Sequence, residues 1–359
     1  MFALLVAIVA LLPSAVAASH LPQAHQDYLQ FAEAQPLAPH PEPAYRFQAE
    51  LHHQLAAWVA QRPGVIRPFE VGQTAGGRTI WGFRVSNPTD EITTHVLVFG
   101  GIHALEWVGT EVVMDLMDSV VHRPPPGMEL VFIPLYNVDG RVRVEGDLMA
   151  GENRYRRGNQ ANVDLNRDFA SNRTSEAIWR HLIPKRYTTS PGALSQPETR
   201  ALTALAAAEQ FDYAVSLHAF GGFHYFPWAG RWERPEDWQE FLKLGRVMEW
   251  GEVEHAYKSR QLSRWGFFFR GLGMEVDHFY EQYGTRSFLI EMTRSGLHPL
   301  KPAEWSNSFR LYNPPDPAPH SQRGMRGIRQ MLWFVARPEV ADRWDWHVDP
   351  PAKTRVPND

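Results

Sequence analysis

The sequence contains no cysteine among its 359 residues. Any metal site must therefore use His, Asp or Glu, and a thiolate nucleophile is excluded. Secreted proteins often carry disulfides, but a chain of this length can bury a large core without them. The absence of cysteine therefore leaves the cellular compartment open.

Clustered positive charge is also lacking. The net charge is -4, and the basic residues are scattered along the chain rather than gathered in a run. Proteins that bind nucleic acid need such charge along the phosphate backbone, so we expect no nucleic-acid partner. The sequence has no internal repeat, and 44% of its residues are hydrophobic. These features favour one large α/β domain.

The N-terminus lacks the basic residues of a typical export signal, because no Lys or Arg precedes Arg46. An apolar run from Phe2 to Leu12 is nevertheless followed by Ala15-Val16-Ala17. This pattern predicts a signal peptide over residues 1–17, with a buried N-terminal helix as the alternative. The run is shorter than the roughly 20 residues of a membrane span. We therefore expect a secreted or periplasmic protein with no membrane association after signal removal.

Composition divides the rest of the chain into three parts. Residues 18–45 are polar and contain four prolines between positions 36 and 43, which predicts an extended segment on the surface. A catalytic domain is predicted over residues 46–338. Residues 339–359, rich in Trp, Pro and charge, are predicted to form a C-terminal tail.

Within the domain, short apolar runs alternate with helical patterns. A glycine-rich turn over residues 72–78 predicts a hairpin. Strands are predicted at 95–99, 128–135, 211–217 and 288–292, and helices at 51–59, 111–121 and 197–208. Residues 195–198 show a capping-box pattern before the last of these helices. The alternation predicts a single α/β domain with a central mixed, mostly parallel sheet flanked by helices.

Candidate metal ligands follow two of the predicted strands. His103 and Glu106 lie three residues apart after the first strand, so on a turn their side chains point the same way. His218 directly follows another strand, and sites gather at the carboxyl ends of strands in such sheets. Imidazole and carboxylate are good zinc ligands. Taken alone, these three residues leave a solvated or core role equally open.

The chain resembles the zinc metallocarboxypeptidase family of the carboxypeptidase A and B type. Seven segments carry the resemblance in the family's order and together span most of the chain. These are VG with GR at 71–78, GGIHALEW at 100–107, NVDG at 137–140, YRR at 155–157, VDLNRDF at 163–169, SLH at 216–218 and FLIEM at 288–292. The resemblance implies the zinc carboxypeptidase fold and a peptide substrate.

The resemblance also implies a catalytic site. It implies that His103, Glu106 and His218 hold one Zn²⁺ per chain and leave a position for water. It assigns to Glu291 the role of general base, which takes a proton from water and passes it to the leaving amine. The apolar setting of Glu291 agrees with that role, because burial raises the pKa of a carboxyl group. A structural ion pair with Arg286 or Arg294 is the alternative for Glu291.

A further cation is implied near the metal. Arg156 matches the family's arginine that stabilises negative charge on the attacked carbonyl oxygen. Arg154 and Arg157 lie close to it in the sequence, so the assignment among the three is ambiguous. A solvated basic turn is the alternative for any one of them.

Substrate-binding residues are implied next. Asn166 and Arg167 match the pair that grips a terminal carboxylate, which a guanidinium binds with two parallel hydrogen bonds. A carboxylate held there makes the enzyme an exopeptidase. Val276 matches the floor of the specificity pocket and favours an apolar terminal residue. Glu275 and Asp277 flank it, so a shift of one residue reverses that preference.

Two departures from the family pattern affect the substrate site. Pancreatic members carry an arginine between the first His and Glu ligands, where this chain has Ala104 and Leu105. The family's mobile tyrosine aligns with Phe269, which has no hydroxyl. Gripping of a terminal carboxylate is therefore less firmly implied than metal binding.

Three functions remain open from the sequence. The first is a carboxypeptidase that removes a C-terminal amino acid. The second is an amidase of the same fold acting on cell-wall peptides or N-acyl amino acids. The third is a non-catalytic binding protein, against which the full ligand set and Glu291 argue. The oligomeric state is not determined by the sequence.

Overall fold

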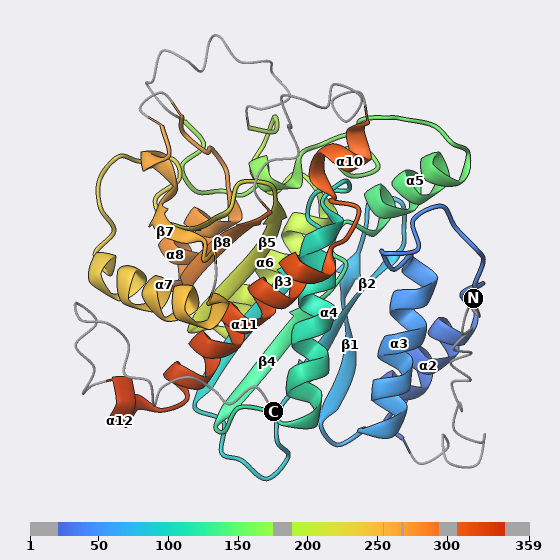
Figure 1. Ribbon diagram of the computed structural model, residues 1–359, viewed down its shortest axis with the longest axis horizontal. Helices are drawn as coiled ribbons and strands as arrows, with labels where there is room; N and C mark the ends of the chain where they lie inside the picture. The colour runs from blue at the N-terminus through green and yellow to red at the C-terminus, as the bar shows by residue number, and fades with distance from the viewer. Residues whose placement is uncertain (1–20, 175–188, 254, 267–268, 294–306, 342–359) are drawn as a thin grey trace.

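The computed structural model describes residues 21–174, 189–253, 255–266, 269–293 and 307–341 (Figure 1). The predicted signal peptide and residues 342–359 of the predicted tail lie outside this part of the chain. Among the described residues, no helix has the length and apolar character that crossing a bilayer requires.

An eight-stranded mixed sheet forms the centre of the molecule, in the order β1-β2-β4-β3-β5-β8-β6-β7 (Figure 1). The strands are β1 (Ile66–Gln73), β2 (Thr79–Val85), β3 (Thr94–Gly100), β4 (Met128–Ile133), β5 (Tyr213–Ala219), β6 (Phe223–Phe226), β7 (Lys258–Gln261) and β8 (Arg286–Met292). The four strands β4, β3, β5 and β8 run parallel, whereas β2 and β6 pair antiparallel at either side of them. The predicted mixed, mostly parallel sheet is confirmed, as is the hairpin of β1 and β2.

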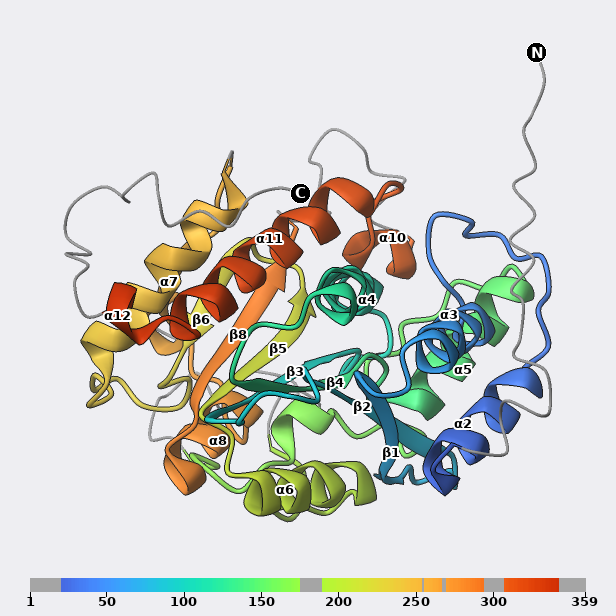
Figure 2. The ribbon, with the colours of Figure 1, turned by 90° about the horizontal axis from the view of Figure 1, so that it is seen from below.

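Helices cover both faces of this sheet, as Figure 2 shows. On one face lie α4 (Trp107–His122) and α11 (Ala318–Val335), and on the other lie α6 (Pro197–Glu209) and α8 (Glu275–Tyr283). The remaining helices are α2 (Gln23–Glu33), α3 (Gln48–Gln61), α5 (Val138–Met149), α7 (Trp238–Glu252), α10 (Ser308–Tyr312) and α12 (Pro338–Ala341), with the 3₁₀ turns η1 (Leu165–Arg167) and η4 (Leu262–Arg264). The helices predicted at 51–59, 111–121 and 197–208 are α3, α4 and α6.

The segment predicted to be extended over residues 18–45 instead contains α2. Tyr28 of this helix is fully buried, and its ring packs edge-on against Trp81 and Phe83 of β2 at 4.9 and 5.0 Å. Its hydroxyl lies 3.1 Å from Nδ1 of His52 in α3. The prolines that suggested an extended chain all follow residue 35, so residues 23–33 were free to form a helix.

The capping box predicted at residues 195–198 is also wrong. Gln196 is the N-cap of α6, and its side chain makes no capping hydrogen bond. Asp168, from a distant loop, instead holds the residues just before the helix, because its carboxylate accepts from the backbone N–H groups of Ser195 and Gln196 at 3.1 and 2.9 Å. This contact ties the loop around η1, which carries candidate site residues, to the start of α6.

The parallel strands place the candidate site at their carboxyl ends. The loop after β3 leads into α4, and β5 and β8 lie beside it in register, with Gly100 opposite Leu217 and His218 opposite Glu291. Gly109 in α4 allows the helix to lie close against β5, since a Cβ there would come within 2.7 Å of the Leu217 carbonyl oxygen. Segments far apart in the sequence therefore meet at one edge of the sheet.

Candidate metal centre

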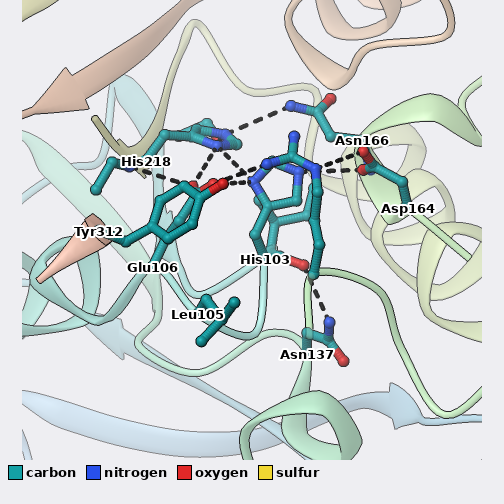
Figure 3. Close-up of polar contacts among 12 residues, drawn as sticks. His103, Leu105, Glu106, Asn137, Asp164, Asn166, His218 and Tyr312 are labelled. Carbon is teal, nitrogen blue, oxygen red and sulfur yellow. Dashed lines mark hydrogen bonds and ion pairs between the residues drawn. The ribbon is translucent and has the colours of Figure 1, made fainter. Parts of the chain in front are cut away.

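Three buried side chains converge at this edge. His103 and Glu106 come from the loop between β3 and α4, and His218 comes from β5; each is at most 3% exposed. Nδ1 of His103 lies 2.8 Å from Oε1 of Glu106. Nδ1 of His218 lies 3.1 Å from both His103 Nδ1 and Glu106 Oε2 (Figure 3). The structure thus brings the three predicted ligands together, with donor atoms within 4.8 Å of one another.

In both imidazoles the second ring nitrogen, Nε2, contacts a carboxylate. Nε2 of His103 lies 3.1 Å from Oδ1 of Asp164, and Nε2 of His218 lies 3.1 Å from Oε1 of Glu275. Each ring is therefore held with Nδ1 directed at the place where the three donor atoms meet. Protein metal sites commonly orient their histidines in this way. Two imidazole nitrogens and one carboxylate form an open zinc-type donor set, so these residues fit a catalytic metal.

The charges around the centre act strongly on one another. Burial alone raises the pKa of Glu106, but His103 and His218 outweigh it and bring that pKa well below its usual range. Burial lowers the pKa of His218, but hydrogen bonds to Glu106 and Glu275 raise it to about 10. A metal ion bound here would displace the proton of His218, because an imidazole that ligates a metal is neutral.

Arg157 reaches this centre, whereas Arg156 does not. Nη1 of Arg157 lies 3.0 Å from Oε1 of Glu106, and its Nε lies 2.7 Å from Oδ2 of Asp164. Arg156 instead donates to Asp147, with Nη2 2.9 Å from Oδ1. The structure therefore places Arg157 at the centre, where the sequence analysis expected Arg156. The two side chains contact different acidic partners, which sequence order alone cannot resolve.

Glu291 of β8 lies beside the metal group, by which we mean the three candidate ligands His103, Glu106 and His218. It pairs in register with His218, so both side chains emerge on the same face of the sheet. Among the described residues, its Oε2 is buried and has no hydrogen-bond partner. Burial, followed by the charge of Glu106, raises the pKa of Glu291 to about 8. Gly221 leaves room for this carboxylate, because a Cβ there would lie 2.9 Å from Cβ of Glu291.

The structural alternative for Glu291 was an ion pair with arginine. Arg286, one candidate partner, faces Asp237 with Nη2 3.4 Å from Oδ1. Arg294, the other, lies outside the described residues. No described arginine forms a salt bridge with Glu291.

Asn166 and Arg167 lie in η1 next to the metal group. Oδ1 of Asn166 accepts from the backbone N–H of Glu275 at 3.1 Å, and its Nδ2 lies 3.5 Å from Nε2 of His218. Arg167 is 8% exposed, and its Nη1 donates to the Asn166 carbonyl at 2.6 Å. The predicted carboxylate-gripping pair is thus beside the site, with Glu275 as its immediate neighbour.

Val276, the predicted pocket floor, lies in the first turn of α8 and is 1% exposed. It belongs to a small apolar cluster that includes Tyr225, Met274 and Leu289. Its surroundings are apolar, as the sequence interpretation expected, and its role in a specificity pocket stays a prediction.

Tyr312 of α10 is a site residue that the sequence analysis missed. Figure 3 shows its ring beside Glu106 and the two histidines. Its hydroxyl lies 3.2 Å from that of Tyr155, and its ring centroid lies 5.4 Å from that of Phe220. Burial raises the pKa of its phenol, so the hydroxyl stays protonated and can donate a hydrogen bond. No motif or periodicity near residue 312 signals this position.

The residue after Tyr312 anchors it to the metal ligands. Asn313 is fully buried, and its Nδ2 donates to the carbonyl of Leu105 at 2.7 Å. Its Oδ1 accepts from the backbone N–H of Trp107 at 2.9 Å. Asn313 thus binds the chain on both sides of Glu106, which holds α10 and Tyr312 against the centre.

The comparisons with known proteins agree with this geometry. The model of the zinc carboxypeptidase family matches residues 51–307. The chain belongs to the zinc carboxypeptidase family. Among curated members, it is 20% identical over 216 residues to carboxypeptidase O of Bos taurus, covering 56% of this chain and 57% of the relative. It is 24% identical over 190 residues to carboxypeptidase D of Drosophila melanogaster, covering 49% of this chain and 13% of the relative.

This zinc carboxypeptidase homologue therefore spans less than two thirds of the length of those curated relatives. Solved structures show the same fold. Bovine thrombin-activatable fibrinolysis inhibitor, solved in complex with tick carboxypeptidase inhibitor, matches with a TM-score of 0.66 at 17% identity, covering 82% of this chain and 98% of that one. Carboxypeptidase A from Helicoverpa armigera matches with a TM-score of 0.64 at 18% identity, and the match covers 89% of this chain and 80% of that one.

Proposed function

We propose that this chain is a zinc-dependent hydrolase that removes the C-terminal amino acid of a peptide, with Zn²⁺ held by His103, Glu106 and His218. The observation that carries the proposal is the convergence of these three donors beside Glu291, whose Oε2 has no described partner. When bound, Zn²⁺ supplies a Lewis acid that brings the pKa of water to about 7.

Two residues of the chain would then act in the reaction, one by transferring a proton and the other by stabilising the charge that develops. Glu291 accepts the proton of the attacking water and returns it to the leaving amine. Its raised pKa suits a group that must take up and release a proton near neutral pH. Arg157 stabilises the negative charge that develops on the carbonyl oxygen, because its guanidinium lies at the metal group and Arg156 does not.

Substrate binding would use the residues around this centre. Arg167 and Asn166 grip the terminal carboxylate and so place the last peptide bond at the metal. Tyr312 donates a further hydrogen bond to the substrate, and so supplies the hydroxyl that Phe269 lacks. Val276 contributes an apolar wall to the pocket for the terminal side chain.

A second candidate function is amide hydrolysis in cell-wall peptides or N-acyl amino acids by the same residues. Glu275 favours it, because this buried carboxylate acts electrostatically on Arg167. Its negative charge offsets part of the positive charge with which Arg167 would attract a free terminal carboxylate. A substrate that carries a positively charged group beside its terminal carboxylate would fit better than a simple C-terminal peptide.

We also propose that the protein is exported to the periplasm or secreted. The apolar run from residue 2 to residue 12 and the small residues that follow it support this proposal. N-terminal sequencing of the protein recovered from its native host would show a start near residue 18. A mature chain that retains Met1 would contradict it.

One experiment separates the candidate functions. The mature protein is incubated with hippuryl-Phe, hippuryl-Arg, a cell-wall stem peptide and an N-acyl amino acid, each with and without a chelator. Chelator-sensitive release of only the last amino acid from the hippuryl substrates supports the carboxypeptidase. Cleavage of the stem peptide or the N-acyl substrate alone supports the amidase. Glu291→Gln serves as the inactive control, and no turnover of any substrate by the wild type would contradict both.

A further inference from the structure

Glu275 has a defined relationship to one metal ligand. It is the first residue of α8 and is fully buried. Its Oε1 lies 3.1 Å from Nε2 of His218, and its backbone N–H donates to Oδ1 of Asn166 at 3.1 Å. Its second oxygen, Oε2, has no hydrogen-bond partner among the described residues. His218 is therefore the described side chain against which this carboxylate is held.

The arrangement repeats what Asp164 does for the other histidine. Asp164 lies 3.1 Å from Nε2 of His103, the same distance as Glu275 from His218. Asp164 precedes η1 and Glu275 begins α8, so the two carboxylates come from separate parts of the chain. Each imidazole thus has Nδ1 at the metal group and Nε2 on a carboxylate.

Neither Ser216 nor Asn166 could fix the state of the His218 ring, because Nδ2 of Asn166 lies 3.5 Å from Nε2, at the limit of a hydrogen bond. The hydroxyl of Ser216 lies 2.8 Å from the same Nε2, and a hydroxyl can either donate or accept a hydrogen bond. A carboxylate oxygen only accepts, so it requires the proton of the neutral ring to be on Nε2. The lone pair is then on Nδ1, the atom that faces His103 and Glu106. Glu275 therefore determines which ring nitrogen of His218 carries the proton, which Ser216 cannot do.

We propose that Glu275 is a positioning residue for the metal, which holds His218 in the tautomer and orientation that present Nδ1 and makes that nitrogen a stronger ligand. The proposal rests on the proposed metal site but not on which substrate is cleaved. Partners of this kind typically contribute about 10- to 100-fold to metal affinity.

The test measures zinc affinity without substrate. Zinc dissociation constants are determined by competition with a chromophoric chelator for the wild type, Glu275→Gln and Glu291→Gln. We expect Glu275→Gln to bind zinc about 10- to 100-fold more weakly. The matched control Glu291→Gln makes the same change in charge in the same site without a hydrogen bond to His218, so it should lose clearly less zinc affinity than Glu275→Gln. Equal affinities for Glu275→Gln and wild type would overturn the proposal.

Two further measurements separate positioning from folding. Glu275→Asp keeps a charged group that can only accept, whereas the amide of Gln can also donate, so it should recover part of the zinc affinity that Glu275→Gln loses. No recovery would count against the role. Nitrogen-15 NMR of the wild-type zinc form should show the His218 proton on Nε2 and the metal on Nδ1. The opposite tautomer would overturn the proposal even where a variant fails to fold. Failure to cleave any peptide would leave these results standing, so the two proposals fail separately.

Discussion

The guanidinium of Arg157 lies against the carboxylate of Glu106, with Nη1 3.0 Å from Oε1. Asp164 accepts from the same side chain, and the two carboxylates hold the pKa of Arg157 well above its usual value although burial acts against it. Arg156, one residue earlier, instead donates to Asp147. This pair of neighbours offers a direct comparison of a central and a peripheral arginine.

Replacing Arg157 should therefore cost much more activity than replacing Arg156. We expect Arg157→Gln to lower kcat/KM by about 100- to 1,000-fold, as for the loss of one oxyanion-stabilising donor. Arg156→Gln should change it by less than about threefold, because Arg156 pairs with Asp147 rather than with the metal ligands, so no oxyanion-stabilising donor is lost. Steady-state kinetics on the cleaved substrate, with zinc content measured for both variants, provides the test. The reverse order of effects would return the role to Arg156.

The acidic limb of the pH profile should report Glu291. Burial raises its pKa to about 8 in the metal-free protein, and a bound dication nearby can only lower it. Because the ionised carboxylate is the base, kcat/KM should rise with pH through a midpoint at or below about 8 and then level off. Glu291→Gln should retain zinc yet lose turnover by several orders of magnitude. Substantial activity in that variant would remove Glu291 as the base.

The hydroxyl of Tyr312 should contribute to substrate binding. Tyr312→Phe removes it with little change of shape, and we expect kcat/KM to fall by about three- to tenfold, the value of one hydrogen bond. The effect should appear mainly in KM, because the residue grips the substrate rather than moving a proton. Tyr155→Phe is the matched control, since it removes the partner hydroxyl at 3.2 Å but leaves Tyr312 intact. Equal effects of the two substitutions would contradict a particular role of the Tyr312 hydroxyl in substrate binding.

Metal removal should lower the stability of the fold as well as activity. A ligand that binds only the folded state stabilises it by about 4 kcal/mol when present at about 1,000 times its dissociation constant. Thermal unfolding should therefore occur at a clearly lower temperature after chelation and recover when zinc is restored. In His103→Ala the two conditions should give the same transition. A wild-type Tm that chelation leaves unchanged would argue against a metal at this site.

Most of the fold could be predicted from local patterns. The apolar runs that became β3, β4, β5 and β8 are short and continuous, and strands covered on both faces have this composition. The helix in residues 23–33 was missed because the prolines after it dominated the composition of the segment. The capping box before α6 was wrongly predicted because Ser195 hydrogen-bonds to Asp168, which lies far away in the sequence, instead of to the helix.

Within the site, the sequence identified residues by motif and strand position, but it did not show which way side chains turn. His103, Glu106, His218 and Glu291 each lie in or directly after a central parallel strand, so they converge once the strands align. Arg156 and Arg157 lie in a loop, where neighbouring side chains diverge according to the charges around them. The acidic partners Asp147 and Glu106 decided that outcome.

Sequence alone determined the elements whose signal is carried by neighbouring residues: the buried strands, the hairpin and the ligands that follow the strands. Tertiary structure alone decided the contacts between distant segments, namely Glu275 on His218, Asn313 around Glu106, and Tyr312 over the metal group. The physical reason is that strand and helix patterns depend on periodicity over a few residues. A single side chain brought in from another part of the chain has no periodicity, and its place depends on the packing of the whole domain.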